Sequence, residues 1–147
     1  MFLVKIQANI PVGMNIIMLP KIFESIIPVI PNFEYCSRKS LNGTKLYERG
    51  NSFGYNNLVV DFRNIPDMLN FSKTVIMDCT HSVQRPGAGN GVTGGNREFI
   101  PAMALAAKAF GATGYFFEIH PNPDAALSDG TNMLPLNLFE NVLKSLL

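Results

Sequence analysis

The sequence predicts an α/β fold built on a parallel sheet. Two short apolar runs, at residues 75–77 and 114–117, are followed almost at once by ionisable side chains. Buried parallel strands read as continuous apolar runs, and their carboxyl ends open into the ligand crevice of α/β folds. A glycine-rich loop and an alanine-rich stretch with helical spacing separate the two runs. The chain therefore shows the rhythm of consecutive β/α units.

Bulk composition narrows the function classes. The chain has 147 residues, enough for one domain, and a net charge of +1 with 16% charged residues. So weak a charge gives no reason to expect binding to nucleic acid or to an acidic membrane surface. No apolar run approaches the roughly 18 residues that a membrane-spanning helix needs. Two cysteines in unlike contexts, Cys36 and Cys79, argue against a disulfide framework, so we expect a soluble protein of the reducing cytoplasm.

The expected elements form two groups along the chain. The first comprises a strand at 2–6, a helix at 16–27, a polar loop at 32–43, a strand at 45–50, an extended run or helix entry at 58–63 and a helix at 64–71. The second comprises the strand at 75–77, a helix at 97–110, a strand at 114–120 and a helix at 136–147. Asn96 is expected to cap the helix at 97–110 and Gly111 to end it. The side chains expected to face inward from the last two helices are Phe99, Ile100, Met103, Leu105, Ala106, Ala109, Leu138, Phe139, Val142, Leu143 and Leu146.

Residues 85–96 contain five glycines and one proline. Such a segment cannot pack by itself, so we expect a mobile lid, a backbone cradle for a ligand or a flexible connection. The Gly-Lys-Ser/Thr ending of a Walker loop is absent, and no Gly-x-Gly-x-x-Gly fingerprint opens the next helix. A nucleotide site is therefore not expected.

His81, Glu118 and Asp129 are the candidate metal ligands. If both strands end on one rim, an imidazole and two carboxylates converge there, which is a suitable ligand set for Zn, Mn or Fe. The alternative is that Glu118 and His81 satisfy polar groups at the base of a loop, because the spacing of the three residues belongs to no local metal motif. His120 is expected to be a structural histidine.

Arg49 stands at another strand end, beside Gly50. The planar fork of a guanidinium suits a phosphate or carboxylate, whereas an ordinary ion pair with Glu48 or Asp61 is the alternative. A nucleophilic pair of Cys79 and His81 is the weaker hypothesis, because strand neighbours hold a thiol too rigidly for in-line attack.

Five motifs in unbroken order resemble the 3-deoxy-8-phosphooctulonate (Kdo8P) synthase family. They are Glu48-Arg49-Gly50 with the run from Ser52 to Arg63, Asp78-x-Thr-His-Ser-Val-Gln84 with Pro86-Gly87, Gly94-Gly95, Phe117-Glu-Ile-His-Pro121, and Ser128-Asp-Gly130. The resemblance covers residues 44–147, whereas residues 1–43 match poorly. It implies the last three or four β/α units of a (β/α)8 TIM barrel.

That family condenses phosphoenolpyruvate with D-arabinose 5-phosphate and water, releasing phosphate, in lipopolysaccharide synthesis. The resemblance implies that Arg49 holds the phosphoenolpyruvate phosphate and that His81, Glu118 and Asp129 hold a divalent metal in metal-dependent members. It further implies catalytic roles for His81 and Arg49 and a mobile loop at 87–95. Substrate contacts are implied for Arg49 and for three further positions. These further positions are Asn57, Arg63 and Gln84.

Family members are longer, and the segments that bind the pentose phosphate have no counterpart in this sequence. Three or four β/α units cannot close an eight-stranded barrel, so apolar faces and strand edges remain that another chain or segment must cover. We therefore expect a homo-oligomer or pairing with a missing half. The alternative is an inactive truncated fragment that keeps a partial phosphate or metal pocket or serves as a packing module.

Overall fold

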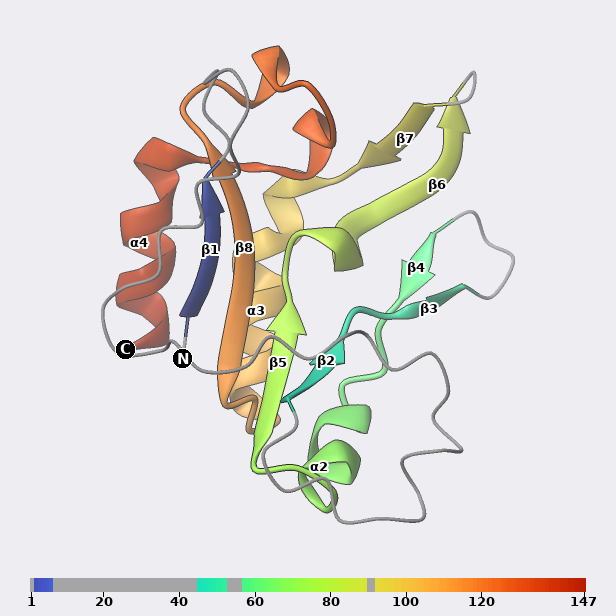
Figure 1. Cartoon of the computed structure of the whole chain (residues 1–147), viewed down its shortest axis with the longest axis vertical. Coiled ribbons are helices and arrows are strands. Elements are labelled where there is room, and N and C mark those ends of the chain that lie inside the picture. Colours follow the sequence, from blue (N-terminus) through green and yellow to red (C-terminus); the bar gives the residue numbers. More distant parts are fainter. Residues whose placement is uncertain (1, 7–44, 53–56, 90–91) are drawn as a thin grey trace.

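The computed structural model describes residues 2–6, 45–52, 57–89 and 92–147. Its main sheet has the strand order β1-β8-β5-β2, with β9 added beside β8 (Figure 1). The strands are β1 (Phe2–Ile6), β2 (Lys45–Glu48), β5 (Thr74–Asp78), β8 (Gly114–His120) and β9 (Leu134–Pro135). All their pairings are parallel, as the apolar runs predicted.

Three β/α units follow one another in the sheet. Each of the neighbouring strands β2, β5 and β8 is followed in the chain by a helix, and the helices are α2 (Asn64–Leu69), α3 (Ile100–Ala109) and α4 (Leu136–Leu146). The short hairpin of β3 (Asn51–Ser52) and β4 (Leu58–Val59) lies between β2 and α2. This is the architecture of a partial (β/α)8 barrel, as expected.

The first strand of the described chain lies beside the last long one. Phe2 is in register with Tyr115 and Ile6 with Ile119, in parallel. The strand expected at 2–6 is thereby confirmed, and it stands at the end of the strand order opposite β2. The helix expected at 16–27, the loop at 32–43 and Cys36 lie outside the described residues.

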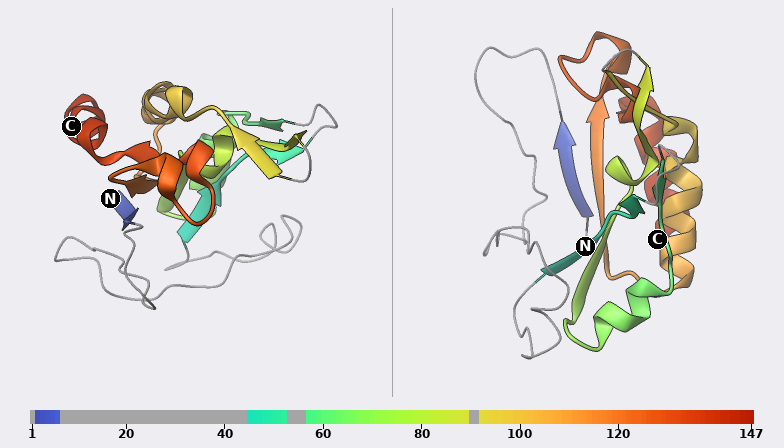
Figure 2. Two further views of the ribbon diagram at one scale, coloured as in Figure 1. Left: turned by 90° about the horizontal axis from the view of Figure 1, so that it is seen from above. Right: turned by 90° about the vertical axis from the view of Figure 1, so that its right-hand side faces the viewer.

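The hydrophobic core lies between the sheet and the helices α3 and α4, which both cover one face of the sheet (Figure 2). Alternate residues of β5 and β8, among them Met77 and Phe117, are fully buried against that layer. Phe117 also packs edge-on against Phe139 of α4, with ring centroids 5.6 Å apart. Side chains of a strand alternate between faces, so Phe116 and Glu118 belong to the opposite face, the inner face of a barrel.

The two long helices largely confirm their predictions, with local corrections. An expected Asn96 cap is not formed: the 3-10 turn η2 (Arg97–Phe99) precedes α3, and the Asn96 amide donates to Glu98 Oε1 at 2.6 Å. The helix α3 ends at Ala109, and Gly111 follows two residues later with φ 90°, as expected of a helix stop. None of the helices within the described residues has the length and apolar character that a membrane span requires.

Some apolar side chains predicted to face inward are exposed. Phe99, Leu105 and Leu138 are 51%, 44% and 46% exposed, and Ala109 is also exposed. The face that α3 buries runs instead through Ile100, Ala104 and Ala107, a spacing of four and three residues. A short, almost wholly apolar helix leaves the choice of buried face to its tertiary partners.

The glycine-rich segment forms an antiparallel hairpin, which was not predicted. Its strands are β6 (Gln84–Gly89) and β7 (Val92–Gly95), and their pairing is irregular between Arg85 and Gly89. The hairpin begins directly after the turn that carries His81 and returns to the start of η2. Backbone pairing between the two arms of the hairpin thus orders a sequence that has no packing pattern of its own.

Candidate metal and phosphate site

The carboxyl ends of the strands bring three predicted residues together. One ligand atom from each of His81, Glu118 and Asp129 lies within 4.8 Å of the others. His81 opens the turn η1 (His81–Val83) directly after β5, Glu118 belongs to β8, and Asp129 lies in the loop before β9. Because these elements derive from consecutive β/α units with parallel strands, their carboxyl ends share one rim. The convergence expected from the sequence is therefore present.

Asp78 holds His81 in place. Its Oδ1 accepts hydrogen bonds from the backbone N–H groups of Thr80 and His81, at 3.2 and 2.9 Å. Its Oδ2 lies 2.8 Å from His81 Nδ1. A carboxylate is an acceptor, so this contact fixes the proton on Nδ1 and leaves the lone pair of Nε2 facing Glu118 Oε1 at 3.7 Å. Carboxylate-supported histidines of this kind are typical of metal centres.

The charge environment of His81 favours a cation at the cluster formed by His81, Glu118 and Asp129. Burial lowers the pKa of His81, but the hydrogen bond and charge of Asp78 and the charge of Glu118 raise it more, while Arg49 opposes them. The net pKa lies above the ordinary histidine value. Without a metal ion, a proton on the imidazole supplies the positive charge that the surrounding carboxylates attract.

Glu118 is almost wholly buried, with 2% exposure. Its backbone N–H donates to the hydroxyl oxygen of Thr80 at 2.8 Å. Thr80 is fully buried and precedes His81, so this bond fastens the end of β5 to the middle of β8. The His81 ring also stacks on Phe116, with centroids 5.7 Å apart. Together these contacts hold two of the three ligand atoms on one rigid layer.

Asp129 enters the cluster from a constrained turn. Its φ of 51° is the left-handed backbone conformation, which is uncommon outside glycine, although Asn and Asp adopt it more readily than other residues. It stands directly before the 3-10 turn η4 (Gly130–Asn132), and its carbonyl accepts from Asn132 N at 2.8 Å. The turn therefore fixes the backbone from which the Asp129 carboxylate enters the cluster.

Gln84 joins Arg49 to the cluster. Arg49 Nη2 donates to Gln84 Oε1 at 2.8 Å, and Gln84 Nε2 donates to Asp129 Oδ1 at 3.2 Å. The ion pair considered as an alternative for Arg49 is not formed with either expected partner. Glu48 instead accepts from Gly50 N and Asn64 Nδ2, and Asp61 accepts from Arg63. Arg49 is exposed, so its guanidinium remains accessible to an anion.

Two predicted substrate residues make no hydrogen bond to His81, Glu118 or Asp129 in the described part of the chain. Arg63 is highly exposed, and its Nε donates to Asp61 Oδ1 at 2.8 Å. That contact lowers the pKa of the exposed Asp61 carboxyl and raises the pKa of Arg63. Asn57 is half-buried and lines a separate cavity, which Gln84 also borders. Their roles as substrate contacts stay predictions.

The remaining candidates are structural. His120 is buried, and its Nδ1 accepts from Asn122 N at 2.9 Å, in agreement with the expected structural histidine. Cys79 is fully buried, its sulfur lies 3.7 Å from Met77 O, and burial raises its pKa well above the ordinary value. A buried thiol held protonated is no nucleophile.

Sequence reasoning missed the supporting role of Asp78. The residue stood in the organising motif, three positions before His81, and that spacing is the signal that was available. An aspartate at the end of a strand, followed by a tight turn, satisfies the first amides of the turn with its side chain. The same geometry brings its second oxygen to the imidazole.

The residues present fit a divalent ion. One imidazole and two carboxylates offer nitrogen and oxygen donors suited to Zn, Fe or Mn, and three protein ligands leave positions open. Glu118 and the supporting Asp78 are buried, which keeps their geometry rigid. Fold and site together define a segment of a β/α barrel whose polar groups gather at the carboxyl ends of its strands.

The chain belongs to the DAHP synthetase I family, whose model matches residues 23–146. It is 58% identical over 99 residues to the 2-dehydro-3-deoxyphosphooctonate aldolase of Legionella pneumophila (strain Corby), covering 67% of this chain and 36% of that protein. It is 54% identical over 101 residues to the protein of the same name from Nitratidesulfovibrio vulgaris (strain DP4), covering 69% and 37%. The predicted resemblance to Kdo8P synthase, which is this aldolase, is confirmed.

A solved structure agrees with the fold. The chain superposes on a DAHP synthase from Thermotoga maritima with a TM-score of 0.56 and 31% sequence identity, covering 68% of this chain and 27% of that one. The chain spans about a third of the length of the curated relatives it matches. It therefore corresponds to a part of a Kdo8P synthase.

Proposed function

We propose that this chain provides the phosphoenolpyruvate- and metal-binding part of a Kdo8P synthase site and catalyses the family reaction. In that reaction C3 of phosphoenolpyruvate bonds to the aldehyde carbon of D-arabinose 5-phosphate, water adds at C2 and inorganic phosphate leaves. The supporting observation is the connected set in which Gln84 bridges Arg49 and Asp129, while Asp129 shares a cluster with His81 and Glu118.

Each group has a role that its geometry allows. Arg49 would hold the phosphate of phosphoenolpyruvate, because a guanidinium donates two parallel hydrogen bonds to such a group. His81, Glu118 and Asp129 would hold the divalent ion, which when bound polarises an oxygen or activates water. Asp78 would keep the imidazole in the tautomer that offers Nε2 outward.

The assembly and location belong to the same proposal. Among the described residues β2 pairs with β5 alone, and a closed eight-stranded barrel needs further strands on that side. A second copy of the chain or a complementary half would supply them, so we propose a homo-oligomer. The buried free thiol of Cys79 agrees with a reducing cytoplasm.

A second candidate is a binding module without turnover. It is favoured by the extent of the match, about 36% of the relatives' length. On this alternative the cluster binds a divalent ion and Arg49 binds phosphate, but the pentose phosphate is not held and no condensation follows. The two candidates share the same residues and differ in turnover.

A coupled assay of phosphate release separates them. The purified chain is incubated with phosphoenolpyruvate, D-arabinose 5-phosphate and Mn²⁺ or Zn²⁺, with Arg49→Ala as a matched control. Phosphate release that needs both substrates and is lost in the control supports the synthase. Release no greater than the blank rejects it for this chain, and saturable Mn²⁺ binding that Glu118→Gln removes then supports the binding module.

A further inference from the structure

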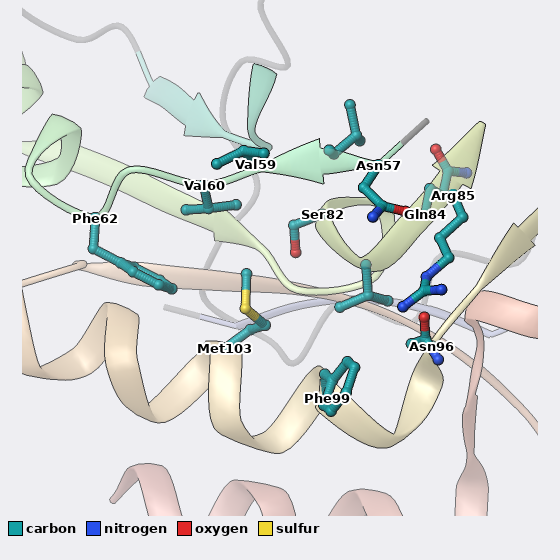
Figure 3. A pocket seen from close by; sticks show the side chains of 12 residues that line it. Asn57, Val59, Val60, Phe62, Ser82, Gln84, Arg85, Asn96, Phe99 and Met103 are labelled. Atoms are coloured by element: carbon teal, nitrogen blue, oxygen red, sulfur yellow. The ribbon is translucent and has the colours of Figure 1, made fainter. Parts of the chain in front are cut away.

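A cavity outside the cluster of His81, Glu118 and Asp129 has the features of a ligand site. It lies between β4, the turn η1 and the start of α3, opens to the protein surface, and has a volume of about 360 Å³. Figure 3 shows the apolar side chains of Val60, Phe62 and Met103 along one part of it. Ligand pockets in proteins span about 300–1,000 Å³, so this cavity suits a small molecule.

A buried hydroxyl without a partner belongs to one of the residues that line this cavity. Ser82 is 3% exposed and lines the cavity, where its side chain is seen between the two walls (Figure 3). Its Oγ has no hydrogen-bond partner among the described residues. Buried hydroxyls in native proteins nearly always have a partner. A polar ligand atom placed in the cavity would supply one.

A guanidinium stands at the polar mouth of the same cavity. Arg85 lines it together with Asn96, and no ion pair of Arg85 occurs within the described part of the chain. The nearby charges are otherwise engaged. Arg97 pairs with Asp124 at 2.6 Å, and Glu98 accepts from Asn96 at 2.6 Å while the charges of Arg85 and Arg97 contribute to its lowered pKa.

We propose that this cavity binds a small amphipathic carboxylate. The branched or aromatic body would lie on the apolar walls, and the carboxylate would reach the fork of Arg85 and the hydroxyl of Ser82. A carboxylate fits better than a phosphate, because one guanidinium and one hydroxyl match its two oxygens and the rest of the lining is largely apolar.

The proposed cavity adjoins the cluster of His81, Glu118 and Asp129, and none of these three residues lines it. Gln84 lines the cavity and also bridges Arg49 and Asp129. A ligand in the cavity would therefore touch Gln84, the residue that links Arg49 to Asp129. The binding itself does not depend on the proposed synthase activity, and it is measured without substrates.

Methyl NMR of the whole chain labelled at methionine tests the proposal. The probe is 4-methylpentanoate, whose branched body and carboxylate match the cavity. We expect the Met103 methyl signal to shift saturably, with a dissociation constant on the order of 1 mM. The signal of Met77, which is fully buried in the core, serves as an internal reference and should not move.

Two variants and a neutral probe isolate the polar contacts. Arg85→Gln should weaken 4-methylpentanoate binding about tenfold. The neutral probe, 4-methylpentanamide, should bind the wild-type chain with an affinity similar to that of the variant for 4-methylpentanoate. Arg85→Gln should leave amide binding unchanged. Ser82→Ala should weaken binding of the acid several-fold and raise the urea midpoint of the ligand-free chain, because it removes an unsatisfied hydroxyl.

Absence of a saturable Met103 shift would overturn the proposal, as would equal binding of acid and amide. A Met103 signal that changes with protein concentration but not with the probe would assign the cavity to a second copy and also overturn it. An unchanged Met77 signal in each variant shows that the fold is intact.

Discussion

Replacing Asp78 with asparagine tests how the cluster is built. The amide oxygen of the introduced side chain can still accept from the backbone N–H groups of Thr80 and His81, which now bond to Asp78 Oδ1 at 3.2 and 2.9 Å. The other atom becomes an NH2 donor facing His81 Nδ1. Two donors cannot share that 2.8 Å contact, so Nδ1 must give up its proton and become the acceptor.

The consequence falls on the opposite ring nitrogen. A neutral imidazole with a bare Nδ1 carries its proton on Nε2, the atom that faces Glu118. That nitrogen then cannot donate a lone pair to a metal ion. Loss of such supporting carboxylates lowers metal affinity by about 10- to 100-fold, or about 1.4–2.7 kcal/mol. We expect Asp78→Asn to weaken Mn²⁺ or Zn²⁺ binding by that amount while the fold persists.

Titration calorimetry with Zn²⁺, or competition against a chromophoric chelator, gives the affinity. Nitrogen-15 NMR of the imidazole reports the tautomer in the metal-free chain. Asp124→Asn is the matched control, because Asp124 is an exposed carboxylate paired with Arg97 outside the cluster. If Asp78→Asn bound metal within twofold of the wild type, or kept the proton on Nδ1, the assignment of Asp78 would be wrong.

Three further predictions concern the surrounding structure. Gly95→Ala would place a Cβ in the space that Asn132 Oδ1 occupies, so urea unfolding should show a loss of about 1–3 kcal/mol; adding Asn132→Ala should restore most of it, and a purely additive double variant would contradict the clash. Gln84→Leu should weaken phosphate binding and metal binding together, by about 0.5–1.5 kcal/mol each in calorimetry, whereas an effect on only one of them would show that the bridge is not shared. The pKa of His81 is raised in the fold, so its protonation stabilises the metal-free chain below about pH 6.5 and this stability is lost as pH rises through the folded pKa; urea midpoints with chelator present should show this pH dependence, and an identical pH dependence in His81→Gln would refute its assignment to His81.

Much of the site could be predicted from the sequence, because the functional residues of β/α barrels lie at the carboxyl ends of the strands. The apolar runs before Asp78 and Glu118 predicted two parallel strands, and the ionisable residues after them predicted one shared rim. Local spacing could not settle whether Arg49 pairs with a neighbour or faces the site. The structure decides this through Gln84, which lies 35 residues away in the chain.

The glycine-rich hairpin marks the limit of pattern reading. Residues 85–96 carry no periodicity, yet the structure pairs them as β6 and β7. Gly95 is required there because Asn132 occupies the space that any side chain would need. Such a contact between distant segments leaves no trace in local composition.

The class of fold, the order of the β/α units and the identity of the polar residues at the strand ends could all be predicted from the amino-acid sequence. These follow from hydrophobic periodicity and side-chain chemistry, which are properties of neighbouring residues. The folded arrangement was needed to show that Asp78 orients His81, that Asp129 adopts a left-handed turn beside it, and which faces of α3 and α4 are buried. These depend on distances between segments far apart in the chain, which packing fixes and local sequence does not.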